Sequence, residues 1–249
     1  MLQVRQEKLR KYIDKKKIVT IGELRELLPD VSVMTIHRDL NALADEGIIE
    51  KVRGGARSVR QEGDPVYDVR MRENTAGKNI VVEKALRLIR PDNSVFLDAG
   101  TTNLLLARNI PDININVITT SPGIALELCR MSNPIITLCG GTMQRRNQSV
   151  SGRNTLEMLR NINIDIAFIG VSGFSVDSGF TCGTEEDVYT KRLVIEKART
   201  SVILCDHTKF RRLMPYTFCD IDGADYLICD RPLPDAIRHA IGDGRMKVL

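Results

Sequence analysis

The stretch FLDAGTTNLLLA, residues 96–107, combines residue types that bind anions. An apolar run ends in Asp98, turns through Gly100, Thr101 and Thr102, and then re-enters an apolar pattern. We expect a strand that passes into a helix at this point. The unpaired backbone N–H groups and the dipole of a helix N-terminus favour an anion, and small hydroxyl residues leave room for it. The sequence therefore predicts an anion site at the start of this helix.

Polar and small residues follow other apolar runs in the same half of the chain. The runs INVITT, IITLC, DIAFIGV, SVILC and YLICD have the composition of buried strands and alternate with helical patterns. Such alternation indicates a mainly parallel sheet covered on both faces, whose ligands bind outside the carboxyl ends of the strands. Hydroxyls and a lysine there suit phosphate oxygens, and the carboxylates suit sugar hydroxyls. The further candidates at these strand ends are Ser121, Gly141, Asp206 and Lys209.

The first sixty residues predict a different kind of module. Leu9, Tyr12 and Ile13 have the spacing of one buried helix face. A second helix is expected to start at the capping box of Thr20 and Glu23, and a third after Ser32. Three short helices with tight turns indicate a helix-turn-helix, in which the outer face of the last helix reads the major groove.

After the third helix, the segment IIEKVRGGARSVR reads as a strand, a Gly-Gly turn and flanking arginines, which is typical of a wing. Wing arginines are suited to contacts with the DNA backbone or minor groove. A module of this kind can instead bind only protein, but the positive charge favours DNA. The candidate DNA-binding residues are Met34, Thr35, His37, Arg38, Asn41, Arg53 and Arg57.

The positive charge of the chain is concentrated in this module. Residues 1–60 contain 13 Lys and Arg against 9 Asp and Glu, whereas the remaining residues contain 23 of each. The apolar runs are too short for a membrane helix and the N-terminus lacks a signal-peptide pattern, so we expect a cytoplasmic protein without a membrane partner. The six cysteines form no C-x-x-C pair and favour buried thiols over metal ligands.

These patterns predict a winged helix-turn-helix over residues 1–57, a linker over 58–77 and a ligand-binding α/β domain over 78–249. The linker interval is polar and charged, is interrupted by Gly63 and Pro65, and has room for a short helix at its end. The expected fold class is α/β, with a Rossmann-like, mainly parallel second domain.

The segment TIHRDLNALADEGIIEKVRGGA resembles the N-terminal signature of DeoR-type bacterial transcriptional regulators, with His37 where an arginine is common. The stretches FLDAGTTNLLLA, DIAFIGVSGFSVDSGFT and DHTKF are similar to the effector domain of the same family. The resemblance implies a domain related to sugar-phosphate isomerases that binds phosphorylated sugars or polyol phosphates. It places Gly100, Thr101 and Thr102 in a phosphate loop. The pocket positions that it implies elsewhere are Asp98, Ser121, Gly141, Glu185, Asp206 and Lys209.

An enzyme is the alternative class, namely a sugar-phosphate isomerase with an appended DNA-binding domain. Residues Asp222 to Asp225, D-G-A-D, are similar to a motif of ribose-phosphate isomerases, although a turn before the strand YLICD is the simpler interpretation. Of the three histidines, His207 is the candidate near the pocket, and Glu185 is a further possible base. No nucleophile–base pair or metal-ligand cluster is evident, so we expect no catalytic residue, metal or cofactor.

The hypothesis is therefore a transcriptional regulator, most simply a repressor, of carbohydrate metabolism genes. A homo-oligomer, dimer or tetramer, would present paired recognition helices to double-stranded operator DNA. A phosphorylated sugar or polyol phosphate would control operator affinity. The sequence leaves open the effector, the operator and the number of subunits.

Overall fold

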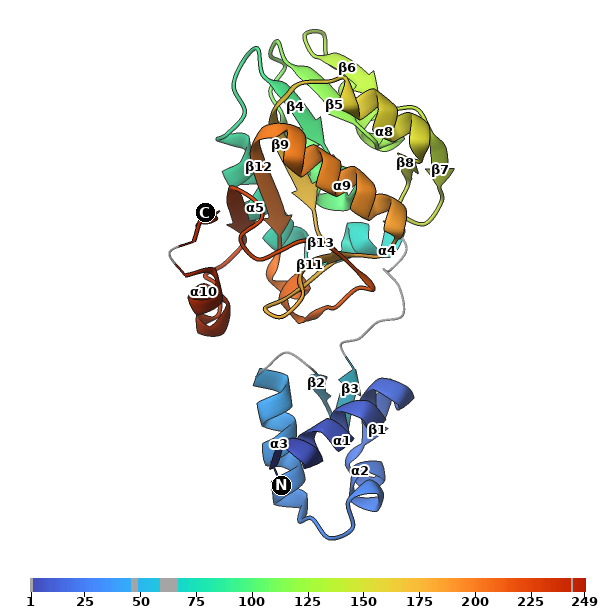
Figure 1. The fold of residues 1–249 in the computed structure, drawn as a ribbon, viewed down its shortest axis with the longest axis vertical. Coiled ribbons are helices and arrows are strands. Elements are labelled where there is room, and N and C mark those ends of the chain that lie inside the picture. Colours follow the sequence, from blue (N-terminus) through green and yellow to red (C-terminus); the bar gives the residue numbers. More distant parts are fainter. Residues whose placement is uncertain (1, 46–48, 59–66, 243) are drawn as a thin grey trace.

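The computed structural model describes residues 2–45, 49–58, 67–242 and 244–249. The described chain forms a small N-terminal unit and a larger α/β unit, which are treated separately below (Figure 1).

The N-terminal unit contains three helices and a three-stranded antiparallel sheet with strand order β1-β3-β2. Its elements are α1 (Leu2–Lys16), β1 (Ile18–Thr20), α2 (Ile21–Leu27), α3 (Val33–Asp45), β2 (Ile49–Val52) and β3 (Gly55–Ser58). The predicted inward positions Leu9, Ile13, Ile36 and Leu40 are fully buried in one core. The three helices and the wing hairpin predicted from the sequence are therefore confirmed.

Both predicted helix starts in this unit are also confirmed. The Thr20 hydroxyl accepts from the backbone N–H of Glu23, and the Glu23 carboxylate accepts from the N–H of Thr20 at 2.8 Å. The Ser32 hydroxyl accepts from the N–H of Thr35 at 3.2 Å. Each side chain satisfies a backbone group that the first helical turn leaves unpaired.

The α/β unit is built on a seven-stranded sheet with order β15-β14-β12-β9-β4-β5-β6, in which every neighbouring pair is parallel. Six of these strands are the predicted apolar runs. The strands are β4 (Ser94–Leu97), β5 (Asn116–Thr119), β6 (Ile135–Leu138), β9 (Ile164–Gly170), β12 (Ala198–Cys205), β14 (Tyr226–Cys229) and β15 (Lys247–Val248).

Helices cover both faces of this sheet, as continuous apolar strands predict. One face packs against α4 (Tyr67–Arg72), α5 (Thr75–Leu86), α6 (Thr101–Asn109) and α7 (Pro122–Leu128). The opposite face packs against α8 (Arg153–Arg160), α9 (Glu185–Lys197) and α10 (Asp235–Ile241). Figure 1 shows α8 and α9 lying across this second face. Neighbouring residues of one strand enter different cores, since Val95 and Leu97 belong to the first and Phe96 to the second.

Smaller elements extend the carboxyl edge of the sheet. They are the hairpin β7 (Thr142–Gln144) and β8 (Ser149–Ser151), the antiparallel sheet β10 (Gly173–Ser175), β11 (Gly179–Cys182) and β13 (Tyr216–Cys219), and the 3-10 helix η1 (His207–Arg211). Together they surround the strand ends where ligands bind in sheets of this class.

The interval expected to be a linker, residues 58–77, contains ordered elements. Ser58 ends β3, residues 59–66 with Gly63 and Pro65 lie outside the described residues, and α4 occupies residues 67–72. Tyr67 is buried in the core of the α/β unit, and its N–H donates to the Arg146 carbonyl at 3.2 Å. The chain therefore joins the packing of the α/β unit well before residue 78.

Five of the six cysteines are buried, and only Cys129 is exposed. Burial raises the pKa of the Cys139 thiol to about 11 and that of the Cys182 thiol to about 12. Within the described residues, no three His, Cys, Asp or Glu side chains are grouped so that they could hold a metal ion.

Candidate functional site

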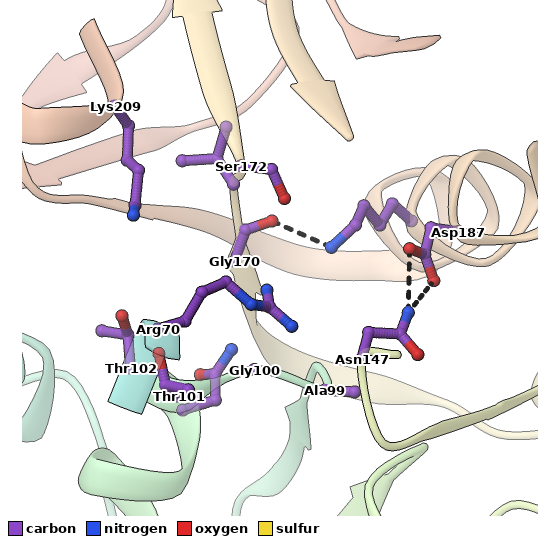
Figure 2. A pocket seen from close by; sticks show the side chains of 13 residues that line it. Arg70, Ala99, Gly100, Thr101, Thr102, Asn147, Gly170, Ser172, Asp187 and Lys209 are labelled. Atoms are coloured by element: carbon purple, nitrogen blue, oxygen red, sulfur yellow. Dashed lines mark hydrogen bonds between the residues drawn. The ribbon is translucent and has the colours of Figure 1, made fainter. Parts of the chain in front are cut away.

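A pocket opens at the carboxyl ends of β4 and β9 (Figure 2). It is lined by residues of α4, the β4–α6 loop, α6, the β7–β8 turn, the end of β9 and the residues after it, α9 and η1. The lining residues are Arg70, Ala99, Gly100, Thr101, Thr102, Asn103, Asn147, Gly170, Val171, Ser172, Asp187, Lys191 and Lys209. Three cationic side chains and one carboxylate face the same space, so cations outnumber carboxylates among the lining side chains.

The N-terminus of α6 forms one wall of the pocket. Its N-cap residue is Gly100, which provides no side-chain acceptor for the N–H groups of the first turn. Thr101 is buried, and Thr102 is half-buried beside it. The first-turn N–H groups, the helix dipole and the two hydroxyls together match the oxygens of a phosphate.

Asn103, the third residue of α6, adds a buried polar group to this wall. Its amide nitrogen donates to the Phe168 carbonyl at 3.2 Å, while its Oδ1 has no hydrogen-bond partner among the described residues. A buried acceptor without a donor is costly unless a ligand or water supplies one. A ligand hydroxyl is one group that would satisfy it.

Lys191 and Asp98 form a buried ion pair behind the same wall. The Lys191 ammonium also donates to the Gly170 carbonyl at 2.9 Å, and the Asp98 carboxylate accepts from the Gly170 N–H at 3.0 Å. Burial disfavours the charged lysine, but the carboxylates of Asp98 and Asp187 outweigh it and raise the pKa of Lys191. The pair fixes the end of β9 against β4 and keeps a cation at the pocket wall.

Lys209 brings a second cation from η1. Its ammonium lies 3.7 Å from the Glu73 carboxylate and 3.9 Å from that of Asp206. Asp206 itself caps η1, because its side chain accepts from the Thr208 N–H at 3.0 Å. Burial opposes the charged form of Asp206. The Lys209 ammonium and hydrogen bonds from Thr208 and Asn74 outweigh burial and lower the pKa of the Asp206 carboxyl.

Asp187 and Asn147 lie together on the side of the pocket away from Lys209 (Figure 2). The Asn147 amide donates to both carboxylate oxygens of Asp187, at 3.0 and 3.1 Å. Burial raises the pKa of Asp187, although Lys191 opposes this effect. A carboxylate here accepts hydrogen bonds from hydroxyl groups and repels a second anion.

The structure brings together some of the sequence-predicted ligand residues. Gly100, Thr101, Thr102 and Lys209 line the pocket. Asp98 and Asp206 lie just behind the lining, where each holds a lining lysine.

The other predicted ligand residues lie outside the pocket lining. Ser121 is buried and caps α7, and Gly141 packs so close to Ser151 that a Cβ atom would lie 2.5 Å from the Ser151 carbonyl oxygen. Glu185 is exposed and accepts from the Tyr189 hydroxyl at 2.6 Å. The geometry therefore favours Asp187, two positions further along α9, as the acidic residue of the pocket.

Sequence reasoning missed five charged or amide residues of the pocket: Arg70, Asn103, Asn147, Asp187 and Lys191. Asn103 directly follows the predicted threonines on α6. The other four belong to a helix inside the expected linker, to a hairpin turn and to α9, none of which directly follows a strand of the seven-stranded sheet. Only the spacing of Asp187 and Lys191, one helical turn apart, could have indicated a shared face.

The D-G-A-D motif lies at the amino ends of the strands, opposite the end at which the pocket opens. Asp225 directly precedes β14, and its carboxylate accepts from the backbone N–H of Ser201 at 2.8 Å and from Arg245. This position confirms the interpretation of a turn before a strand. His207 is engaged by Asp230, with Nδ1 2.6 Å from the carboxylate, and is not part of the pocket lining.

The outer face of α3 presents the predicted recognition residues to solvent. Met34, His37, Arg38 and Asn41 are exposed, and Met34 is 81% accessible. Thr35 is half-buried, and its hydroxyl lies 2.9 Å from that of the N-cap Ser32.

Asp39 points away from this face and binds the Arg5 guanidinium of α1. The acidic residue therefore braces α3 against α1 and leaves the basic and polar face for a partner.

The wing lies beside the recognition helix. The Lys51 ammonium of β2 donates to the Asn41 side chain at 2.6 Å, which ties the wing to α3. Arg53 and Arg57 are both exposed, and Arg57 forms an ion pair with Glu50 at 2.6 Å.

Two family models match this chain. A DeoR-like helix-turn-helix domain covers residues 5–62, and the DeoR C terminal sensor domain covers residues 73–231. The chain belongs to the DeoR family of transcriptional regulators. The fold and regulator class expected from the sequence are thereby confirmed.

Curated relatives of this DeoR-family regulator align over most of its length. The HTH-type transcriptional regulator GlpR of Haloferax volcanii is 33% identical over 88% of this chain and 86% of its own. The transcriptional regulator YgbI of Escherichia coli is 33% identical over 92% of this chain and 90% of its own. The glycerol-3-phosphate regulon repressor of Escherichia coli is 27% identical over 88% of this chain and 87% of its own.

Ribose 5-phosphate isomerase A of Methanocaldococcus jannaschii matches the structure with a TM-score of 0.41 and 19% identity, over 55% of each chain. Among the described helices of this regulator, none combines the length and apolarity that crossing a membrane requires.

Proposed function

We propose that this DeoR-family regulator binds a phosphorylated sugar or polyol phosphate in the pocket at the carboxyl edge of its sheet, and that the bound effector changes operator affinity. The observation that carries the proposal is the start of α6, which has no side-chain cap and is flanked by Thr101, Thr102, Arg70 and Lys209. This arrangement supplies N–H groups, hydroxyls and two cations to one anion.

The rest of the pocket supports a ligand that carries hydroxyl groups as well as a phosphate. Asp187 and Asn147 offer hydrogen-bond acceptors and donors away from Lys209, and the Oδ1 of Asn103, which has no partner in the described part of the chain, needs a donor. Inorganic phosphate would occupy only the α6 end. We therefore favour a polyhydroxylated phosphate monoester over a simple anion.

The same observations support a sensor over an isomerase. Isomerisation needs a positioned base whose pKa suits proton transfer. The pocket carboxylate Asp187 is already engaged by the Asn147 amide, and the histidine nearest in sequence to the lining residues, His207, is engaged by Asp230.

The N-terminal module is proposed to bind operator DNA through α3 and the wing. Repression is the proposed mode, in which the effector lowers DNA affinity because it binds the DNA-free arrangement more tightly. Such coupling is typically worth about 1–3 kcal/mol.

Thermal unfolding against a panel of phosphorylated sugars and polyol phosphates tests the effector proposal, with the unphosphorylated compounds as controls. A ligand that binds only the native state stabilises it by about 2.7 kcal/mol at a hundredfold excess over Kd. We expect a phosphorylated compound to raise the unfolding temperature when its parent sugar does not. No shift with any member would contradict the proposal.

A further inference from the structure

Helix α4 connects the two functional parts of the chain and also contributes to the pocket. It is the first described element after β3, and only residues 59–66 separate the two. Tyr67, at its start, is buried in the core of the α/β unit. Arg70, one turn later, is half-buried, and its side chain extends across the pocket toward Asn147, beside Gly100 and Thr101 (Figure 2).

Glu73, the residue directly after α4, links this helix to the region of η1. The Glu73 carboxylate lies 3.7 Å from the Lys209 ammonium and 3.2 Å from the Arg212 guanidinium. Burial opposes the charge on Glu73, but Arg212 and Lys209 outweigh it and lower the pKa of the carboxyl. Glu73 is not part of the pocket lining, whereas Lys209 is.

Lys209 therefore stands between a carboxylate attached to α4 and the anion site. A bound phosphate dianion would attract Lys209 and would compete with Glu73 for it. The same dianion would attract Arg70 directly. Both changes act on α4. The phosphate adds a contact to Arg70, and it weakens the contact between Glu73 and Lys209.

We propose, on the basis of the effector function above, that Arg70 is a ligand of the effector phosphate and that Glu73 is a positioning residue that competes for Lys209. Effector binding then exchanges a Glu73–Lys209 contact for an Arg70–phosphate contact. The exchange changes how α4 is held, at the element that leads to the DNA-binding module. A ligand can shift such an equilibrium only through its different affinity for the two arrangements, which this exchange of contacts provides.

Hydrogen exchange of the full-length protein, with and without inorganic phosphate and at constant ionic strength, tests this proposal. In the wild type, phosphate should slow exchange at the first turn of α6 and in α4. Arg70→Gln should lower phosphate affinity by about tenfold or more, because a charge-assisted contact is lost. At phosphate concentrations that saturate this variant, α6 should still be protected but α4 should not.

Arg72→Gln is the matched control, since Arg72 is an exposed arginine on the same helix and outside the pocket lining. It should leave both affinity and protection unchanged. Glu73→Gln should bind phosphate about two- to fivefold more tightly, because Lys209 is released for the anion. If Glu73 had only a structural role, its replacement would instead weaken phosphate binding.

The outcomes separate the two proposals. Protection of α6 without any change in α4 in the wild type would overturn the role of Arg70 and leave the pocket intact. Equal affinity of the Arg70→Gln and Arg72→Gln variants for phosphate would do the same. Absence of protection at α6 in the wild type would contradict the phosphate pocket itself and, with it, this inference.

Discussion

Thr101 and Thr102 are the side chains that identify the anion site most directly. Both line the pocket at the uncapped start of α6. Replacing both with valine keeps their shape and removes two donors to the phosphate, each worth about 1.5–3 kcal/mol when the partner is charged. We expect the T101V/T102V double variant to lose at least about a hundredfold in effector affinity.

Isothermal titration with the panel compound that stabilises the wild type measures this loss. Operator binding without effector should remain at the wild-type level, because neither threonine belongs to the DNA-binding module. Wild-type affinity for the effector in the double variant would place the phosphate elsewhere.

Asp187 is the residue from which we expect selectivity for hydroxyl groups. Its carboxylate shares the pocket with the phosphate site but lies away from Lys209. Asp187→Asn should lower affinity for the hydroxylated effector by about tenfold, since one charge-assisted hydrogen bond is worth about 1.5–3 kcal/mol. Affinity for inorganic phosphate should be unchanged or higher, because a like charge is removed.

Competition binding with the effector and with inorganic phosphate separates these two effects. Glu185→Gln on the exposed side of α9 is the control and should leave both affinities unchanged. An equal loss for both ligands in the Asp187 variant would show that Asp187 supports the fold of the pocket rather than its selectivity.

At the scale of elements, α3 has separate inner and outer faces. Ile36 and Leu40 enter the core and Asp39 binds Arg5, whereas Arg38 is exposed on the outer face. If Arg38 contacts a base, Arg38→Ala should lower operator affinity by about 1–3 kcal/mol. If Arg38 contacts a phosphate, the same change should lower the slope of log affinity against log salt concentration by about one.

Operator affinity measured at several salt concentrations distinguishes these two contacts. The panel effector should stabilise the Arg38 variant as much as it stabilises the wild type. Unchanged operator affinity would contradict the assignment of α3 as the recognition helix.

Helices α4 and α5 meet at a buried lysine, from which we expect a pH dependence of anion binding. The Lys78 ammonium donates to the Arg70 carbonyl, and burial lowers the pKa of Lys78 to about 8, with Lys209 adding repulsion and Asp206 and Glu73 opposing it. A bound dianion favours the charged form of Lys78. Effector affinity is therefore expected to fall as pH rises through about 8.

Effector titrations on either side of this pH measure the effect, and Lys78→Met provides the comparison. This variant should bind more weakly at neutral pH but lose the further decrease above pH 8. The same decrease in the variant would assign the titration to another group.

At the scale of the whole molecule, the proposed partner is a DNA duplex with two related half-sites. A symmetric dimer presents two recognition helices, and successive major grooves on one side of DNA are about 34–36 Å apart. We expect a footprint on a DNA fragment selected from a random library to contain two half-sites about 10–10.5 base pairs apart, or a multiple of this spacing.

Footprinting together with light scattering of the free protein measures spacing and subunit number. A monomer that protects a single half-site would contradict the proposed oligomer. The Met34 side chain is 81% exposed on α3, and we expect it to contact thymine methyl groups within each half-site.

The sequence by itself determined the three helices and the wing of the N-terminal unit and six of the seven strands of the parallel sheet. Apolar residues at helical spacing in the first sixty positions and continuous apolar strands afterwards leave few alternatives, because each pattern buries a face only in one kind of element. Thr20 and Ser32 could be assigned to helix starts for a local reason as well, because their hydroxyls accept from backbone N–H groups of the first helical turn. The proposed phosphate loop at residues 100–102 could be predicted from the sequence because it closely follows a strand.

Only the tertiary structure decided which side chains share the pocket. Arg70, Asn147 and the α9 pair Asp187 and Lys191 come from three segments far apart in sequence, and no local pattern relates one segment to another. Ser121 and Glu185 have suitable chemistry, but Ser121 caps α7, as its position before Pro122 indicates locally, and the packing of α9 leaves Glu185 exposed. Side-chain direction depends on how helices pack on the sheet, and that packing is a property of the whole fold rather than of any one segment.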